Sequence, residues 1–595
     1  MKVINDVHQQ FAEYFPSEVL KPYLYLLSKK LSEGHICMDV NNIDKSELAS
    51  IGYTSIVRQK ELLREPLVSN GSNKTPFILL DNQLYLERYF NYETIILNRI
   101  KAFIEREKTQ TPGMLEALKQ HTVFINGLFK NTIQESESKE QNINWPLAAA
   151  ITAVLNYFTI ITGGPGTGKT TTVSKILSIL FTLKPDLKVA LTAPTGKAAA
   201  RMAESLKNAS SFASKLIRSK FETLEPSTIH RLLGNIKNSP HFKHNAENTL
   251  NYDVVITDES SMIDVALFAK LLDAVGPNTK LILLGDKDQL ASVEAGSLFG
   301  DLCQAQTKLN TFSEGRAELI NSFIENTTQE ISDSYIDSIS THPLFEHIIE
   351  LQRSHRFSDN KGIGKFSKAI IHNKVDAIKE FFSNSDEQVL IDTNYSEKIF
   401  DNFIAGYEEF INEKDTSIAL KKMNRLRVLC AVREGERGLY AINKKIEKYL
   451  QQKKLIHLTG DFYVNRPIMV TGNNKELQLF NGDIGIIRPD EKGVLKAWFE
   501  TGKGEVRAVL PGYISNAETV YAMTIHKSQG SEFDQVLVSL PKGDDIQILT
   551  RELLYTAVTR AKQKVIVQGS EALILQTSRA FVERGSGIIN RLNQG

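Results

Sequence analysis

The sequence is poor in cysteine and has no long apolar run. Only three of its 595 residues are cysteines, namely Cys37, Cys303 and Cys430. Three widely separated cysteines form neither a disulfide framework nor a zinc-binding pattern, so a reducing compartment, the cytoplasm, is expected. The most apolar stretch, residues 147–162, is short and is interrupted by Asn156, so no membrane span is expected. The N-terminus also lacks the apolar core of a signal peptide.

An excess of charge of one sign is missing as well. The chain has 71 basic and 70 acidic residues, which gives a formal net charge of +1. This balance excludes a uniformly basic coat for nucleic acid, although it does not exclude a basic channel inside a neutral protein. The hydrophobic content of 42% is ordinary for a globular protein. At ~150 residues per domain, the length suggests about four domains.

The most specific motif lies in residues 158–176, FTIITGGPGTGKTTTVSKI. An apolar strand, a glycine-rich loop and a helix follow one another here, and Gly163, Gly168, Lys169 and Thr170 satisfy the P-loop pattern. In such a loop the backbone N–H groups and the helix N-terminus bind phosphate oxygens, the lysine reaches the β- and γ-phosphates, and the threonine hydroxyl binds Mg²⁺. The sequence therefore predicts a site for a nucleoside triphosphate, ATP, with Mg²⁺. The expected phosphate-binding residues are Gly163, Gly164, Pro165, Gly166, Thr167, Gly168, Lys169, Thr170 and Thr171.

Acidic residues follow two further apolar strands downstream of this loop. The run VVIT stands directly before Asp258 and Glu259, and LILL is followed by a Gly-Asp loop that contains Gln289. Because parallel sheets place ligands at the carboxyl ends of their strands, we expect these groups to meet the P-loop at one edge. Asp258 is expected to complete the Mg²⁺ site, and Glu259 is expected to orient and deprotonate water.

The second half of the chain repeats the strand and helix pattern and contributes two arginines. Arg356 follows an apolar strand, and Arg560 lies on a helix before the last strand. Two α/β units in tandem predict a nucleotide site in the cleft between them, where both arginines would neutralise transition-state charge. Residues 461–515 contain short strands and Gly/Asn/Asp turns, which favour a small inserted β-barrel. Residues 133–144 are polar and are expected to form a linker.

An ordered series of motifs resembles that of the superfamily 1 DNA helicases of the 5′→3′ branch. The series consists of GGPGTGKTTT, LTAPTGKAAARM, TIHRLLG, ITDESSM, LLGDKDQL, LQRSHRF, MTIHKSQGSEF and LLYTAVTRAK. Within this branch the chain looks like the alpha subunits of exodeoxyribonuclease V, the RecD subunits of RecBCD helicase–nucleases. The segments GHICMDV, LYLERYF, HFKHNAENTLNYD and LFNGDIGII share that likeness, so the resemblance covers essentially the whole chain.

This resemblance implies an α/β fold with two tandem RecA-like P-loop domains. A mostly helical N-terminal domain over residues 1–140 would dock on a partner. The first RecA-like domain would span 145–347, with a strand-separating hairpin at 235–250 and an insertion of unassigned role at 304–345. The second would comprise 348–460 and 516–595, interrupted by an SH3-like barrel at 461–515.

The resemblance also assigns roles to individual residues. Lys169, Glu259, Gln289, Arg356 and Arg560 would be catalytic; Gln289 would sense the γ-phosphate, and Arg356 and Arg560 would be arginine fingers. Gly530 and Glu532 would belong to the nucleotide site, with Glu532 near the ribose. The residues in motifs that line the path of single-stranded DNA are Thr195, Lys197, His230, Thr524 and His526. The candidates for stacking on bases, each of which also suits an apolar core, are Phe299, Phe357, Phe462 and Tyr463.

The function implied is an ATP-dependent 5′→3′ DNA translocase that works as one subunit of a helicase–nuclease acting on double-strand ends. Its partners would be DNA and the beta and gamma subunits of exodeoxyribonuclease V, one of which would carry the nuclease. Two alternatives are a stand-alone helicase of the same branch and a structural subunit with a silent ATPase. A simple P-loop kinase is poorly supported, because it needs neither the second α/β unit nor the second arginine.

The sequence departs from the family pattern at a few positions. The family usually has a Trp-Gln pair before the P-loop, whose glutamine reads adenine, whereas this chain has Trp145 and Pro146. Proline cannot make that amide contact, which puts strict selectivity for adenine in question. His355 replaces a common tyrosine, and Ser260 and Ala557 are small substitutions. None of these changes removes a residue needed for hydrolysis.

Overall fold

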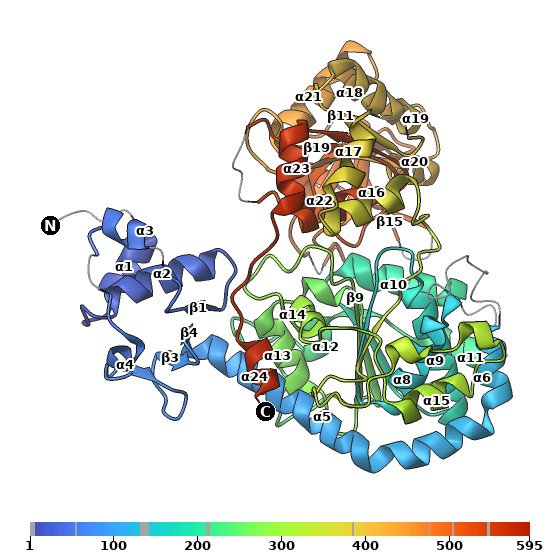
Figure 1. Ribbon diagram of the computed structural model, residues 1–595. Coiled ribbons are helices and arrows are strands. Elements are labelled where there is room, and N and C mark those ends of the chain that lie inside the picture. The colour runs from blue at the N-terminus through green and yellow to red at the C-terminus, as the bar shows by residue number, and fades with distance from the viewer. Residues whose placement is uncertain are drawn as a thin grey trace.

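The chain folds into an N-terminal unit, two units built on parallel sheets, and an antiparallel sheet inserted in the second of these (Figure 1). This computed structural model describes residues 6–43, 45–53, 56–130, 142–209, 215–383, 386–474, 476–501, 505–543 and 548–594. Most of the predicted linker at 133–144 lies outside the described residues. No helix in the described ranges combines the length and apolarity that crossing a membrane requires.

The first parallel sheet has six strands in the order β10-β5-β9-β8-β6-β7. Its central strands β5, β8 and β9 are mostly apolar and are buried along their whole length, as expected for strands covered on both faces. Neighbouring residues of β5 enter different cores: Ile160 packs with α13 and α14, and Ile161 packs with α8 and α9. The strands are β5 (Phe158–Thr162), β6 (Val189–Ala193), β7 (Ser227–Thr228), β8 (Val254–Thr257), β9 (Lys280–Gly285) and β10 (Ile348–Glu350).

Helices cover both faces of this sheet. They are α8 (Trp145–Leu155), α9 (Lys169–Leu183), α10 (Gly196–Ala209), α11 (Lys215–Thr223), α12 (Ile229–Leu233), α13 (Val265–Ala274), α14 (Leu298–Gln304) and α15 (Glu314–Asn321). The predicted hairpin at 235–250 contains no regular strand; a single antiparallel bridge joins Asn235 to Phe242. The insertion at 304–345 adds Phe312, Phe323 and Tyr335 to the core beside α8.

The second parallel sheet has five strands in the order β11-β20-β19-β12-β18. These strands are β11 (Val389–Asp392), β12 (Leu426–Cys430), β18 (Ala522–Thr524), β19 (Phe533–Ser539) and β20 (Ala561–Gln568). The helices of this unit are α16 (Gly362–Ile371), α17 (Val375–Ser383), α18 (Glu397–Ile404), α19 (Glu408–Ile411), α20 (Thr416–Met423), α21 (Leu439–Gln452), α22 (Arg551–Val558) and α23 (Glu571–Arg579). The prediction of two α/β units with parallel sheets is confirmed.

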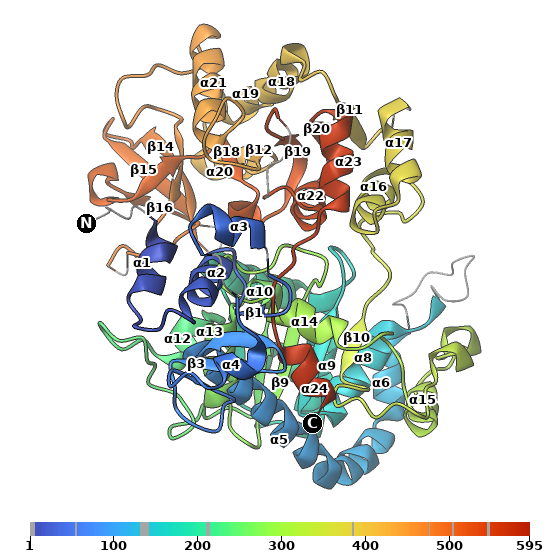
Figure 2. The ribbon, with the colours of Figure 1, turned by 60° about the vertical axis from the view of Figure 1, so that its left-hand side comes forward.

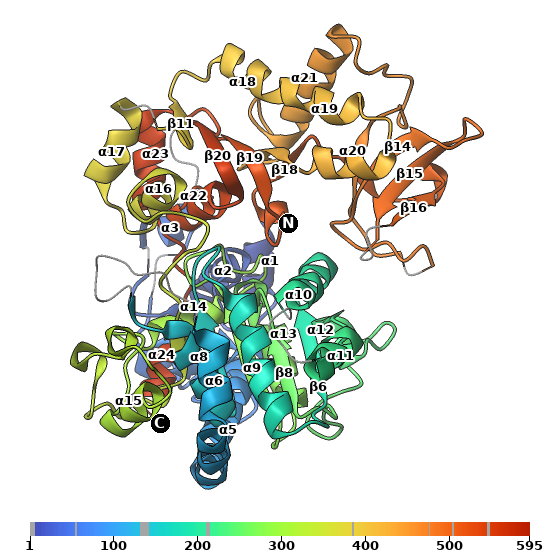
Figure 3. The same cartoon turned by 90° about the vertical axis from the view of Figure 1, so that its right-hand side faces the viewer.

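The insert in the second unit is antiparallel, with the strand order β16-β15-β14-β13-β17. Its strands are β13 (Pro467–Val470), β14 (Ile484–Pro489), β15 (Leu495–Glu500), β16 (Val506–Val509) and β17 (Ala517–Thr519). The last strand lies entirely beyond the predicted limit at residue 515. Ile468 and Phe499 belong to a core of the insert's own. Figure 3 shows the insert beside the second sheet, on the side where α10 lies on the first unit.

The N-terminal unit packs a small sheet against short helices, and the long helix α5 leaves it to run along the first unit (Figures 1 and 2). The predicted hairpin around Asp81 and Asn82 is present as β3 and β4, and both turn residues have positive φ. The elements are α1 (Val7–Glu13), α2 (Lys21–Ser32), β1 (Cys37–Asp39), α3 (Lys45–Ser50), α4 (Gln59–Leu62), β2 (Val68–Ser69), β3 (Phe77–Leu80), β4 (Gln83–Leu86), α5 (Glu87–Gln120) and α6 (Thr122–Phe129).

One carboxylate fixes α5 to the first sheet. Glu107 is buried, and it accepts hydrogen bonds from the N–H groups of Tyr157 at 2.5 Å and Phe158 at 3.0 Å, where β5 begins. It also pairs with Nε2 of His347, which precedes β10, at 2.8 Å. The helix therefore holds the starting ends of two neighbouring strands, one of which leads into the P-loop.

Candidate active site

The loop between β5 and α9 has the predicted form, because the strand ends at Thr162 and the helix begins at Lys169. Gly166 and Gly168 have φ of 79° and 84°, in the left-handed region that favours glycine. A Cβ on Gly166 would lie 2.5 Å from the Cβ of Arg356. Glycine at these positions lets the loop turn and lets the segment after β10 approach it.

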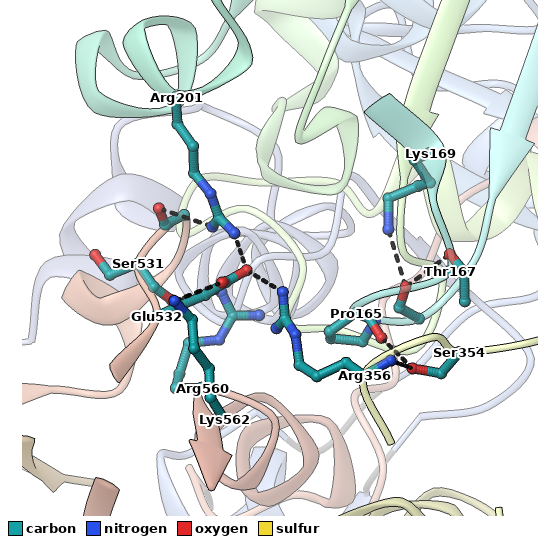
Figure 4. Close-up of polar contacts among 12 residues, drawn as sticks. Pro165, Thr167, Lys169, Arg201, Ser354, Arg356, Ser531, Glu532, Arg560 and Lys562 are labelled. Atoms are coloured by element: carbon teal, nitrogen blue, oxygen red, sulfur yellow. Dashed lines mark hydrogen bonds and ion pairs between the residues drawn. The ribbon is translucent and has the colours of Figure 1, made fainter. Parts of the chain in front are cut away.

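Hydrogen bonds occupy the carbonyl groups of this loop (Figure 4). The Lys169 ammonium donates to the carbonyl oxygens of Gly163 at 2.6 Å and Gly164 at 3.2 Å. The hydroxyl of Ser354 donates to the carbonyl of Pro165 at 2.9 Å. Because the first N–H groups of a helix have no partner within it, the start of α9 presents donors and a positive dipole end to an anion. The loop is therefore built to receive phosphate.

Buried carboxylates lie at the same edge of the sheet. Burial, together with the charge of Glu259, raises the pKa of Asp258 to about 6, although Lys169 acts in the opposite direction. Burial and the neighbouring Asp288 raise the pKa of Asp286 to about 6. Both shifts show that negative charge is costly at this edge, and a cation there would reduce that cost.

The donor set suits a magnesium ion that arrives with phosphates. Thr170 lies in the first turn of α9, and Asp258 follows β8. Mg²⁺ is usually held by one or two carboxylates together with phosphate oxygens and water. The described part of the chain contains no group of three or more His, Cys, Asp or Glu side chains placed to hold a metal. One hydroxyl and one carboxylate therefore fit Mg²⁺ bound to a nucleotide better than a preformed metal centre.

Glu259 has a backbone conformation that is uncommon for its residue type. Its φ is 52°, and its N–H donates to Oδ1 of Asp258 at 2.8 Å. Left-handed conformations of residues other than glycine cost energy and concentrate at functional sites. The conformation supports a special role for this carboxylate, the predicted base.

Gln289 belongs to a loop that joins the two units. Its Nε2 donates to Oδ2 of Asp286 at 2.9 Å, and the hydroxyl of Tyr555, on α22, donates to the same oxygen at 3.2 Å. The N–H of Leu290 donates to the Thr556 hydroxyl at 3.0 Å. The loop after β9 is therefore anchored to the second unit, so a movement of that unit relative to the first would displace Gln289.

The two predicted arginine fingers approach the cleft from different segments. Arg560 is buried, and its guanidinium donates to the carbonyls of Thr556 at 3.2 Å and Ser531 at 3.3 Å. Arg356 lies between β10 and α16 and donates to Oε1 of Glu532 at 2.7 Å. Burial, with Arg201 and Arg560 nearby, lowers the pKa of Arg356 to about 10. Among the described residues, Nη1 of Arg356 is buried without a hydrogen-bond partner, so its N–H groups remain for another acceptor.

Glu532 lies among cationic side chains, whereas the sequence predicted a position near the ribose. It pairs with Arg356 and with Arg201, and the Lys562 ammonium lies 3.7 Å from its Oε2 (Figure 4). Arg201 is a site residue that the sequence interpretation missed. Its signal was its position four residues after Lys197 on α10, which puts both side chains on one face. That face contacts the segment around Ser531: Lys197 donates to the Ser531 hydroxyl at 2.8 Å.

The predicted DNA-contacting residues come from the ends of strands and the helices that follow. Thr195 precedes α10, and its hydroxyl accepts a hydrogen bond from the N–H of Ala198. His230 is exposed on α12 and packs edge-on against the ring of Phe242, with the two ring centroids 5.7 Å apart. Thr524 ends β18, and His526 follows it. Burial and the charge of Arg584 lower the pKa of His526, so it is neutral at pH 7.

Three of the four aromatic candidates for stacking are core residues. The exposed fractions of Phe299, Phe357 and Tyr463 are 1%, 8% and 3%, so they offer no open ring face to a base. Phe462 packs partly buried against the core of the insert. A better placed ring is Phe480, which is half-buried in the insert and would lie 3.7 Å from a Cβ on Gly196.

The positions that depart from the family pattern have the following surroundings, although nothing in the structure explains the histidine side chain at position 355. Trp145 donates from Nε1 to Oε1 of Gln352 at 3.2 Å, so a glutamine from another segment does lie beside this ring. Pro146 occupies the first turn of α8, where its missing N–H costs nothing. His355 uses its backbone N–H to donate to the carbonyl of Gly166 at 2.8 Å. Ser260 and Ala557 are buried, where small side chains fit.

Three family models match separate parts of the chain. Residues 2–85 match the N-terminal domain of the RecBCD enzyme subunit RecD. Residues 147–295 match an AAA domain, and residues 519–568 match a UvrD-like helicase C-terminal domain. The last two regions contain the P-loop and the segment from Thr519 to Gln568 that carries Glu532 and Arg560.

Curated relatives match over most of their length. The RecBCD enzyme subunit RecD of Haemophilus influenzae is 36% identical, over 76% of this chain and 72% of the relative. That of Mycolicibacterium smegmatis is 32% identical, over 95% of this chain and 92% of the relative. A solved structure of Pif1 helicase from Bacteroides covers 78% of this chain and 97% of its own at 14% identity, with a TM-score of 0.38, too low to assign a fold. The domain matches and the two curated relatives place the chain in the family of RecBCD enzyme RecD subunits.

Proposed function

We propose that the chain is an ATP-driven 5′→3′ translocase on single-stranded DNA, and that it works as the RecD subunit of a helicase–nuclease that unwinds and processes double-strand ends. The observation that carries the proposal is the set of charged side chains that meet between the two units. Groups from both units converge there: Lys169 and the carboxylates from the first, and Arg560 and Glu532 from the second. Two units that share one nucleotide site can convert hydrolysis into relative movement.

The residues of the cleft have distinct proposed roles in hydrolysis. Lys169 and the N–H groups of the loop bind the phosphates, and Glu259 accepts a proton from the attacking water. Arg356 and Arg560 neutralise the charge that develops on the transferred group, and Gln289 reports its presence to the second unit. Thr170 and Asp258 would hold Mg²⁺, which supplies charge neutralisation between the phosphates. Trp145 with Gln352 is a candidate boundary of the base site.

The DNA path is proposed to cross the carboxyl ends of both sheets. Thr195 and Lys197 lie after β6, and Thr524 and His526 lie at the end of β18. Burial, with Arg427 and Arg201 nearby, lowers the pKa of Lys197 to about 8, so phosphate would strengthen its charged form. The antiparallel insert would be the SH3-like barrel of the family and would border this path. The polarity follows from the resemblance of the motif series.

The proposed domain limits follow the family. Residues 1–140 would dock on a partner subunit. The predicted limits give 145–347 to the first RecA-like domain and 348–460 with 516–595 to the second, but β10 (Ile348–Glu350) pairs with β5, so the first domain would extend to Glu350. The beta and gamma subunits of exodeoxyribonuclease V are the proposed partners, and the nuclease centre would lie on one of them. Residues 461–515, extended to Thr519 by the strand β17, would form the barrel.

Strand-displacement assays test this function. The purified chain, alone and assembled with its partner subunits, is given ATP, Mg²⁺ and duplexes that carry a 5′ or a 3′ single-stranded tail. Lys169→Gln serves as the blank, because it removes the phosphate-binding ammonium. We expect unwinding of the 5′-tailed duplex, with ATP turnover stimulated by single strands and a loss of at least about 100-fold in the variant.

Each alternative has its own signature in these assays. Unwinding that prefers the 3′ tail would contradict the branch assignment. Equal activity of complexes that contain wild-type or Lys169→Gln chain would favour a structural subunit with a silent ATPase. Full processive unwinding by the chain alone, unchanged by the partner subunits, would favour a stand-alone helicase.

A further inference from the structure

The last segment of the chain leaves the second unit and returns to the first (Figure 1). It starts against α22, where the N–H of Arg551 donates to the carbonyl of Ala580 at 2.9 Å. It ends in α24 (Ile588–Asn593), whose Ile588 and Leu592 are fully buried in the core beside α5. Residues 580–594, here called the tail, therefore bridge the two units that form the cleft.

Arg584 joins the tail to the first unit through several hydrogen bonds. Its Nη1 donates to the carbonyls of Glu294 at 2.9 Å and Gly296 at 2.8 Å, and its Nη2 donates to the carbonyl of Ser292 at 2.6 Å. A fourth bond, of 3.3 Å, reaches the Ser292 hydroxyl. A single guanidinium thus binds the carbonyls of Ser292, Glu294 and Gly296. The planar guanidinium fork of arginine suits this arrangement because its N–H donors are spread over several nitrogen atoms, whereas a lysine ammonium has only three donors on one atom.

The same loop begins at the nucleotide site. Asp286 and Gln289 lie at its start, and the carbonyl of Leu290 accepts from Nε2 of Gln529 at 3.0 Å. Only a few residues separate Gln289 from Ser292, so the loop has little slack between the cleft and Arg584. A movement of one end must therefore displace the other.

The N-terminal unit contacts the tail and the loop at this point. The N–H of Gly296 donates to the carbonyl of Gly34 at 2.9 Å, and the N–H of Gly585 donates to Nδ1 of His35 at 2.7 Å. Farther along, the N–H of Gly587 donates to the buried carboxylate of Glu93 on α5 at 2.8 Å. The proposed partner-docking unit is thus joined to the loop by direct contact and through the tail.

We propose that Arg584 is a positioning residue for ATP hydrolysis: it fixes the loop that carries Gln289, and through the tail it makes that loop sensitive to the N-terminal unit. The proposal rests on the proposed function, since it assumes that Gln289 acts at the γ-phosphate. Loss of the guanidinium would remove donors from the carbonyls of Ser292, Glu294 and Gly296. The Ser292 hydroxyl lies 2.9 Å from the last two carbonyls, but its single proton cannot serve both. The loop would therefore rearrange, and Gln289 would lose its fixed position.

The test compares full-length variants in ATP turnover stimulated by single-stranded oligo(dT). Arg584→Ala and Arg584→Lys remove the fork, and Arg579→Gln, on the exposed end of α23, is the matched control. We expect kcat to fall about tenfold in both Arg584 variants, with KM for ATP changed less than threefold, and the control to equal wild type. Thermal melting and circular dichroism establish that each variant is folded.

Two further variants separate positioning from general destabilisation. In a Gln289→Ala background, Arg584→Ala should cause little additional loss, because both changes disable the same step. Gly587→Ala leaves Arg584 intact but would place a Cβ 1.8 Å from the Tyr85 hydroxyl, which prevents the tail from docking; it should reproduce the tenfold loss. Gly512→Ala, which has open space around its Cβ, is its control.

Hydrogen exchange gives a readout that does not depend on turnover. The amides of residues 287–297 should exchange faster in Arg584→Ala than in wild type, with and without ATP. Unchanged exchange, or losses in kcat that multiply fully with those of Gln289→Ala, would overturn the proposal. The proposed function fails separately, if wild-type chain shows no turnover stimulated by DNA and exceeds Lys169→Gln in no assay.

Discussion

The two parallel sheets bring their functional groups to the cleft from opposite strand ends. In the first sheet, Thr162 and the residues after β8 and β9 stand at carboxyl ends, where parallel sheets usually bind ligands. In the second sheet, Glu532 directly precedes β19 and Arg560 directly precedes β20. The N–H of Phe533 donates to the carbonyl of Arg560 at 2.9 Å, so the two side chains leave neighbouring strands side by side.

This difference separates binding from sensing. The first sheet supplies a lysine, helix dipole and carboxylates, a complete set for holding a triphosphate with its metal. The second supplies Arg560 and the carboxylate of Glu532, which pairs with Arg201 on α10 and with Arg356 in the segment after β10. Both sets of groups are suited to a nucleotide with its metal: burial and neighbouring carboxylates in the first set raise the pKa values of Asp258 and Asp286, and Glu532 holds Arg356 and Arg201 on a carboxylate that a phosphate can replace.

The largest effect is expected from removing an arginine of the second sheet. Arg560→Ala should lower kcat for ATP by about 10³-fold, as for other arginine fingers, while nucleotide binding, which belongs to the first sheet, weakens far less. Single-turnover hydrolysis and titration with a fluorescent ATP analogue measure the two quantities. Arg560→Lys keeps a charge and should recover only part of the rate. If binding and rate fell together, the division of labour between the sheets would be wrong.

An intermediate effect is expected from Glu532→Gln. This change leaves Arg201 and Arg356 without their counter-charge, and breaking a buried pair costs about 3–5 kcal/mol, less here because Arg201 is 38% exposed. The nucleotide-free chain should therefore melt at a lower temperature. ATP brings negative charge back to the arginines, so its addition should raise the Tm of the variant more than that of wild type.

A surface glutamate provides the control for this experiment. Glu436 pairs with Lys542 at 3.6 Å and is 75% exposed, so Glu436→Gln should change neither the Tm nor its response to ATP. If Glu532 instead served only to bind a ribose, Glu532→Gln would leave the Tm of the nucleotide-free chain unchanged and would weaken the stabilisation by ATP.

The smallest effect concerns the tail that joins the two units. Burial raises the pKa of Asp301, on α14, to about 7; Glu93 on α5 adds to the increase, and Ser586 and Arg584 in the tail oppose it. Because the folded-state pKa lies above the unfolded value, the carboxyl group favours folding below about pH 4, and that contribution is lost as the pH rises through about 7. Stability should fall by at least about 1 kcal/mol between pH 6 and pH 8.

Asp301→Asn isolates this contribution. The variant keeps a neutral side chain of the same shape, so its Tm should change less between pH 6 and pH 8 than that of wild type. Glu93, Asp258 and Asp286, whose pKa values are also raised by burial, contribute to the part that remains. Parallel pH profiles for the two proteins would contradict the assignment to Asp301.

The sequence was most informative about functional residues that come directly after an apolar strand. The P-loop, Asp258 and Gln289 were predicted because a run of buried residues announces the strand and its carboxyl end. Arg201 and the surroundings of Glu532 were not predicted, because they depend on which segments meet across the cleft. The prediction of stacking aromatic residues failed for a related reason. The sequence around Phe299 looks the same whether the ring faces a base or packs against Gly285. Contacts between segments distant in sequence, such as Arg584 with the loop at 292–296, left no local pattern.

The strand register of the insert has a consequence for how this architecture can vary. The first and last strands of the insert, β13 and β17, pair with each other, with Ile468 opposite Thr519. The two points where the insert joins the second unit are therefore held together by one pair of hydrogen-bonded strands. The distance between these points does not depend on how many residues the insert contains. Lengthening or shortening the far side of the insert adds only a small loop-closure cost. Evolution can thus resize or exchange this module, and an engineer can graft one from a relative, without resetting the register of β12, β18 and β19.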